Sequence, residues 1–142
     1  MQFDPENPVN KLCAQGIMLE GEGKATEAAE LFSRAWEQAA NAKEKFTSAH
    51  YVARHQTNAA EKLQWDETAL SWAMDADDPE IEHVYPSLYL NIAKGFEDLK
   101  DLDNAAKNYQ LALHYAAILP DDGYSNMIRS GINSGIARIQ TL

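Results

Sequence analysis

Small and apolar residues recur every three or four positions along most of this chain, and polar residues fill the positions between them. The clearest example is residues 28–35, where Ala28, Leu31, Phe32 and Ala35 fall on one helical face. Strand signals, such as a strict alternation of apolar and polar residues, are absent. The pattern therefore predicts an all-α protein.

Capping residues, prolines and glycines divide the pattern into seven predicted helices. Asn7 and Pro8 are typical of a cap and a first helical residue, Pro120 ends the sixth helix, and Asp121 or Asp122 caps the seventh. The sharpest break is predicted at residues 75–82. Six helices are expected at about residues 8–21, 26–40, 42–63, 66–74, 102–119 and 123–139. The fifth, whose approach is bracketed by Pro79 and Pro86, is expected to run to about Leu99.

The chain also repeats itself, because the spacing of residues 89–112 echoes that of residues 12–35. The positions in the later copy are Tyr89, Ile92, Ala93, Phe96, Ala105, Tyr109 and Ala112. Those in the earlier copy are Leu12, Gln15, Gly16, Leu19, Ala28, Phe32 and Ala35. This spacing resembles the tetratricopeptide repeat, a helix pair that shares one packing seam.

The resemblance implies one domain over residues 1–142, in which three antiparallel helix pairs stack as a right-handed superhelix. The pairs are expected at about residues 9–42, 43–79 and 84–119, followed by a capping helix at about 123–140. On that capping helix, a small-residue face is expected to let the backbone approach the sixth helix closely. The face consists of Ser130, Gly131, Ser134 and Gly135.

The middle repeat departs from the pattern. If Ala28, Thr68 and Ala105 are equivalent, both intervals between them are longer than the repeat of about 34 residues that is typical of the family, which indicates insertions. Two registers of the third helix are open. One places Val52, His55, Gln56 and Ala59 on the seam, and the other places Ala49, Val52, Ala53 and Gln56 there. The second is favoured because it buries small and apolar groups and leaves His55 free.

Charge and composition narrow the function. A net charge of −10 disfavours nucleic acids and anionic membrane surfaces as partners, since phosphate binders need a basic stripe. The apolar run from Leu111 to Leu119 is too short to span a bilayer. An acidic N-terminus unlike a secretory signal and a lone Cys13 favour the cytoplasm.

A polar set on the third helix is the main candidate site. His50 and Arg54 lie four residues apart and so share a helical face, and Asn91 and Lys94 fall on the equivalent face of the next repeat. The resemblance implies that such first-helix faces line a concave groove, and one subfamily uses Lys, Arg and Asn there to grip a peptide's terminal carboxylate. Tyr85 is a further candidate, either packed or stacked on a peptide or on Arg54.

The match to that subfamily is incomplete, because Asn10, Cys13 and Ile17 stand where the first repeat would supply its Lys and Asn. We therefore expect a non-enzymatic module that binds a protein or peptide, through an anionic terminus in one version, and not a chaperone-tail receptor. The opposing interpretation pairs His50 and Arg54 with acids such as Glu97 or Asp98.

Two other functions stay open. The first is a self-associating scaffold, a homodimer formed through repeat ends or the last helix. The second is a small-molecule sensor or enzyme that uses His50, Arg54 and His55. The sequence contains no recognisable catalytic or nucleotide-binding motif, and the spacing of its histidines does not favour a metal site. No catalytic residue, metal or cofactor is therefore predicted.

Overall fold

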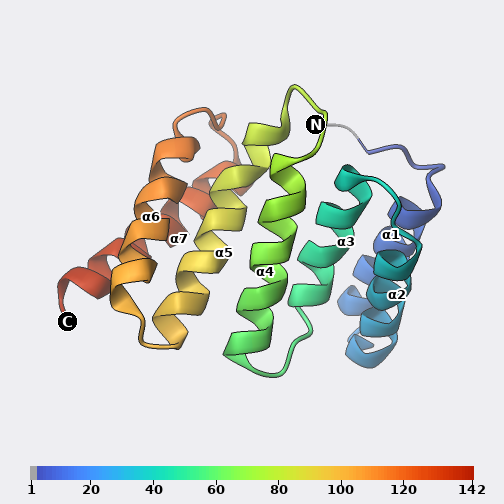
Figure 1. Cartoon of the computed structure of the whole chain (residues 1–142), viewed down its shortest axis with the longest axis horizontal. Helices are drawn as coiled ribbons and strands as arrows, with labels where there is room; N and C mark the ends of the chain where they lie inside the picture. Colours follow the sequence, from blue (N-terminus) through green and yellow to red (C-terminus); the bar gives the residue numbers. More distant parts are fainter. Residues whose placement is uncertain (1–2) are drawn as a thin grey trace. The chain divides into compact units, whose positions relative to one another are not determined.

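The computed structural model describes residues 3–142, and within these it contains seven α-helices, one short 3-10 helix and no strand (Figure 1). The all-α prediction is confirmed. The helices are α1 (Pro8–Gly21), α2 (Ala25–Gln38), α3 (Ala42–Ala53), α4 (Ala59–Met74), η1 (Ile81–Val84), α5 (Tyr85–Asp98), α6 (Leu102–Ala116) and α7 (Gly123–Gln140).

The chain divides into two compact units, Met1–Asp78 and Pro79–Leu142. The first unit holds α1 to α4, and the second holds η1 and α5 to α7. The boundary falls inside residues 75–82, where the sequence predicted its sharpest break. A single domain over residues 1–142 stays a prediction, so each unit is described by itself.

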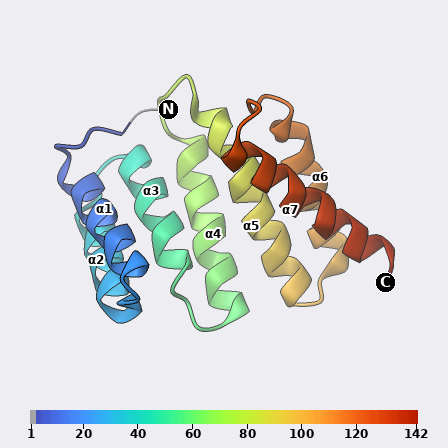
Figure 2. The same cartoon turned by 180° about the vertical axis from the view of Figure 1, so that it is seen from behind.

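In the first unit, α1 pairs with α2 and α3 pairs with α4, and α3 also packs on both α1 and α2 (Figures 1 and 2). The α1–α2 pair closes tightly, since a Cβ at Gly16 would lie only 2.3 Å from the ring of Phe32. Trp36 and Trp65 meet edge to face, with ring centroids 5.1 Å apart. The buried core consists of Val9, Cys13, Ala28, Phe32, Ala35, Ala39 and Val52.

The third helix ends earlier than predicted. It stops at Ala53, and the next helix begins at Ala59, so the expected helices over 42–63 and 66–74 are wrong at their shared boundary. The physical reason is Asn58, whose side chain accepts a hydrogen bond of 2.7 Å from the backbone N–H of Glu61 and caps α4. The side chain of Gln56, which lies in the turn, donates to the carbonyl of Val52.

The insertion is not where the equivalence of Ala28, Thr68 and Ala105 placed it. Helix α3 follows α1 at the same interval at which α4 follows α2, and this interval is the repeat of about 34 residues expected from the resemblance. The interval from α3 to α5, like that from α4 to α6, is longer, and the extra residues lie in the segment that contains η1. On α4 the fully buried small residues are Ala69 and Ala73, and Thr68 is only partly buried.

The favoured register of the third helix is confirmed for its three helical members, because Ala49, Val52 and Ala53 are all buried. His55, however, is not free. It lies beyond the end of α3, and its Nε2 is 2.7 Å from Oε2 of Glu20 on α1.

In the second unit α5 pairs with α6, and α7 packs on both of them (Figure 2). The expected close approach to α6 occurs at Gly135, where a Cβ would lie 2.3 Å from the ring of Tyr109. Gly131 instead approaches α5, since a Cβ there would lie 3.1 Å from Leu90. The backbone of α7 therefore lies directly against side chains of both helices.

Candidate functional site

A pocket of about 200 Å³ lies between α1 and α3 in the first unit. Thr47 and Tyr51 on α3 follow Cys13 and Ile17 on α1 by the same interval that separates the starts of the two helices. Equivalent positions of two successive helix pairs therefore face the same space. The pocket is lined by Phe3, Asn10, Cys13, Ala14, Ile17, Thr47 and Tyr51.

The walls of this pocket are mainly apolar and held in place. The ring of Tyr51 stacks on Phe32 with centroids 5.0 Å apart, and the hydroxyl of Thr47 donates to the carbonyl of Lys43 at 2.8 Å. Ile17, in contrast, is 42% exposed. A preformed concave site with apolar walls and few free polar groups suits an apolar side chain.

Cys13 is unsuited to nucleophilic chemistry. Burial raises the pKa of its thiol to about 11, so the thiol is neutral at physiological pH. Because the thiolate is the reactive form, Cys13 acts in the pocket as a small apolar surface.

His50, a predicted site residue in the first unit, is partly buried and carries no charge at neutral pH. Burial, followed by the positive charges of Arg54 and Lys62, lowers the pKa of His50 to about 4. Its Nδ1 atom is buried and has no hydrogen-bond partner. His50 therefore adds no positive charge to an anion site.

Arg54 is engaged by a carboxylate that the sequence reasoning did not consider. Its Nη2 lies 3.1 Å from Oε1 of Glu20 on α1, and the other oxygen of Glu20 contacts His55. The suggested partners Glu97 and Asp98 have partners in their own unit, Arg138 and Lys94.

The remaining predicted residues, Tyr85, Asn91 and Lys94, lie on α5 in the second unit. Tyr85 is buried, with its ring edge to face with Tyr89 and Tyr115 at centroid distances of 6.3 and 5.1 Å. Asn91 is partly buried, and the exposed ammonium of Lys94 forms an ion pair with Asp98 one turn later.

A buried acid on α4 escaped the sequence reasoning. Asp66 is 1% exposed, its Oδ2 accepts a hydrogen bond of 2.7 Å from Lys62, and its Oδ1 has no partner. Burial raises the pKa of Asp66, and the contact with Lys62 opposes this rise. The repeat interval of the helix pairs could have identified Asp66 as buried. By that interval Asp66 and His50 occupy the positions of Phe32 and Gly16, which pack against each other in the preceding pair.

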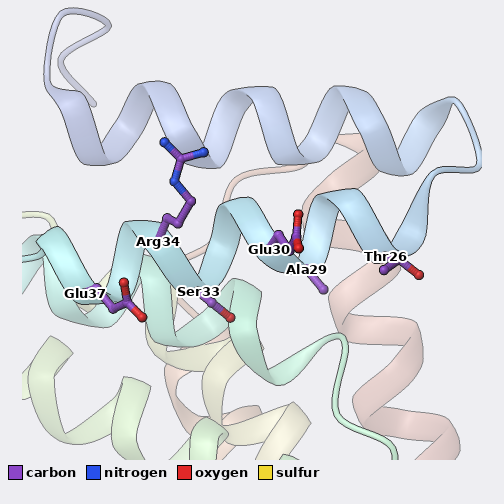
Figure 3. Close-up of a pocket in the computed structure, with 6 residues that line it drawn as sticks. All are labelled: Thr26, Ala29, Glu30, Ser33, Arg34 and Glu37. Atoms are coloured by element: carbon purple, nitrogen blue, oxygen red, sulfur yellow. The ribbon is translucent and has the colours of Figure 1, made fainter.

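A second hollow lies on the surface of α2 and is lined by that helix alone (Figure 3). In Figure 3 the side chain of Arg34 points towards the neighbouring helix. This second hollow has no large apolar or aromatic wall, so the pocket between α1 and α3 is the stronger candidate for a binding site. The residues of this second hollow are Thr26, Ala29, Glu30, Ser33, Arg34 and Glu37.

Within residues 3–142 no group of three or more His, Cys, Asp or Glu side chains is arranged to hold a metal ion. No helix in this described part of the chain is long and apolar enough to cross a bilayer. Comparisons of the chain with models of protein families, with curated proteins and with solved structures find no match.

Proposed function

We propose that this chain is a non-enzymatic, peptide-binding module of the tetratricopeptide type, with its helix pairs in a right-handed superhelix. The observation that carries the proposal is the pocket formed by equivalent positions of α1 and α3. The interval between these positions matches the family's period of about 34 residues, and first-helix faces are where its members bind ligands.

The walls of the pocket favour a ligand with a large apolar or aromatic side chain. The chain itself supports this choice, because Phe3, from the segment before α1, already lines the pocket together with Ile17 and Tyr51. An extended peptide that inserts such a side chain gains affinity from the apolar area it removes from water.

An anionic terminus is a weaker choice of ligand. His50 is neutral at pH 7, and an anion at Arg54 or Lys94 would meet a cation that Glu20 or Asp98 already neutralises. Arg54→Ala is therefore expected to change peptide affinity by less than about twofold, because a solvent-exposed ion pair contributes little free energy. A sensor or enzyme based on His50, Arg54 and His55 stays a prediction.

The test uses two neighbouring residues of α1. Ile17 and Met18 are both exposed and apolar, but only Ile17 lines the pocket. Peptides selected from a random library against the full chain are expected to share one large apolar residue. Ile17→Ser is expected to weaken their binding at least tenfold, measured by calorimetry, and Met18→Ser to leave it unchanged.

The proposal fails if both variants bind the selected peptides as the wild type does, or if both lose binding equally. Circular dichroism of each variant is the control for folding. It is expected to show intact helices, because both side chains are exposed and neither belongs to the core. A library that yields no apolar consensus also contradicts the proposal.

Self-association is a second candidate function, supported by the exposed face of α7. Tyr124 and Met127, one turn apart, are 60% and 62% exposed, whereas Gly131 and Gly135 approach α5 and α6. Exposed apolar neighbours of this kind are typical of contact surfaces. If they pair two copies, light scattering will give a dimer that the double change Tyr124→Ser and Met127→Ser converts to a monomer. A wild-type monomer at all concentrations excludes this candidate.

A further inference from the structure

The segment before α1 is fastened to both helices that line the pocket. The side chain of Asn10 on α1 donates to the backbone oxygen of Asp4 at 3.1 Å. The side chain of Asn7 donates to Oε2 of Glu44 on α3 at 2.7 Å. Residues 4–7 are thus held next to the pocket by contacts with each of its two walls.

Phe3 extends from this segment into the lining of the pocket. Its ring lies 5.2 Å from Nζ of Lys43 and remains 44% exposed. Phe32, a core residue of the same unit, is fully buried. Phe3 therefore lines the pocket without being part of the core, and it buries less apolar area there than the core ring of Phe32 does.

We propose that the segment Phe3–Asn7 is a built-in occupant of the pocket, which covers it until a ligand's side chain replaces Phe3. This inference rests on the proposed function for the identity of the ligand, a peptide with an aromatic side chain. The cover itself rests on the contacts of Phe3, Asn7 and Asn10.

The covered state lowers the affinity of an external peptide. Because Phe3 is tethered, it competes for the pocket at an effective concentration in the millimolar range. A free peptide must bind tightly enough to overcome this competition. The apparent dissociation constant rises by the inverse of the fraction of molecules in which the pocket is open. Removal of the Phe3 ring is expected to tighten peptide binding about threefold to tenfold, on this competition argument.

Cys13 offers a readout that does not depend on any peptide. It is the single cysteine of the chain, lines the pocket and is 3% exposed. Its alkylation by N-ethylmaleimide is slow, because only a small fraction of the thiol is ionised, and the relative rate at one pH reports access to Cys13 in the pocket. Phe3→Ala is expected to accelerate alkylation at least threefold at fixed pH. Met18→Ala, which removes an exposed apolar side chain of α1 that does not line the pocket, is the matched control and is expected to leave the rate unchanged.

The second arm supplies the occupant as a separate molecule. The probe is the peptide Phe-Asp-Pro-Glu-Asn, acetylated and amidated, which copies residues 3–7. Calorimetry is expected to show tighter binding of this probe to the Phe3→Ala chain than to wild type. Binding is expected to be lost when the phenylalanine of the probe is replaced by alanine.

The outcomes separate the two ideas. An alkylation rate that Phe3→Ala leaves unchanged overturns the cover, whatever the probe does. Weaker probe binding to the Phe3→Ala chain also overturns it, because Phe3 then acts as a wall of the site. Faster alkylation without any probe binding supports the cover and contradicts the peptide-binding function.

Discussion

Arg138 on α7 holds Glu97 on α5 through two hydrogen bonds, 2.9 Å from Nε to Oε2 and 3.0 Å from Nη2 to Oε1. The hydroxyl of Tyr109 on α6 donates to the same carboxylate at 2.6 Å. All three long helices of the second unit therefore meet at one acid. The hydrogen bonds from Arg138, more than any other contact, lower the pKa of Glu97 to about 2.

Arg138→Met is expected to lower the free energy of unfolding at pH 7 by about 1 kcal/mol, a modest value because the side chain of Arg138 is 46% exposed. The folded pKa of Glu97 lies below its ordinary value of 4.5. Its contribution is therefore complete above pH 4.5 and is lost as the pH falls towards 2. Urea denaturation at pH 7 and at pH 2.5 is expected to show the difference between the two chains shrinking with acid.

Lys107→Met is the control for this experiment, because Lys107 is exposed on α6 and its substitution removes one positive charge in the same unit. It is expected to change stability by less than about 0.5 kcal/mol at either pH. An Arg138→Met effect that is equal at both pH values contradicts the role assigned to Glu97.

Gly16→Ala is expected to destabilise the first unit by about 1–3 kcal/mol, because the new Cβ would lie 2.3 Å from the ring of Phe32 and force it to move. Gly21→Ala on the same helix is the matched control. Its Cβ meets nothing within 4 Å, so a neutral or slightly stabilising effect is expected. Thermal denaturation followed by circular dichroism compares the two, and equal midpoints would contradict the close packing of α1 on α2.

Lys62→Met is expected to destabilise the chain by about 1–3 kcal/mol, because it leaves the carboxylate of Asp66 buried without a counter-charge. Asp66→Asn is expected to be neutral or stabilising at pH 7. The reason is that burial raises the pKa of Asp66, so its ionised form opposes folding as the pH rises through the shifted pKa. In urea titrations the double variant is expected to recover most of the loss caused by Lys62→Met. Simple additivity would exclude this coupling.

Asn58→Ala is expected to cost about 1 kcal/mol, since it removes the side-chain cap of α4. Gln64→Ala, an exposed change within the same helix, is the control and is expected to be neutral or slightly stabilising. Urea denaturation measures both. If Asn58→Ala is as stable as Gln64→Ala, the cap does not set the start of α4.

Local sequence patterns were sufficient to predict the all-α class, the starts of α1 and α7 and the break between the units. These features depend on interactions within a few residues, such as the Asn7 and Asp122 caps, and on the spacing of apolar residues along one face. A local code of this kind can be read without knowing the fold. The end of α3 was open to the same reasoning, but the Asn58 cap was overlooked because the apolar pattern runs across the turn.

The surroundings of each candidate site residue, in contrast, depend on tertiary packing. Glu20 reaches Arg54 and His55 from a different helix, and His50 is neutral mainly because the packing of the helices buries it. Likewise, Phe3 joins the pocket because Asn7 and Asn10 position the segment before α1. Such contacts between residues distant in sequence arise from the packing of whole helices, which periodicity along one helix does not fix.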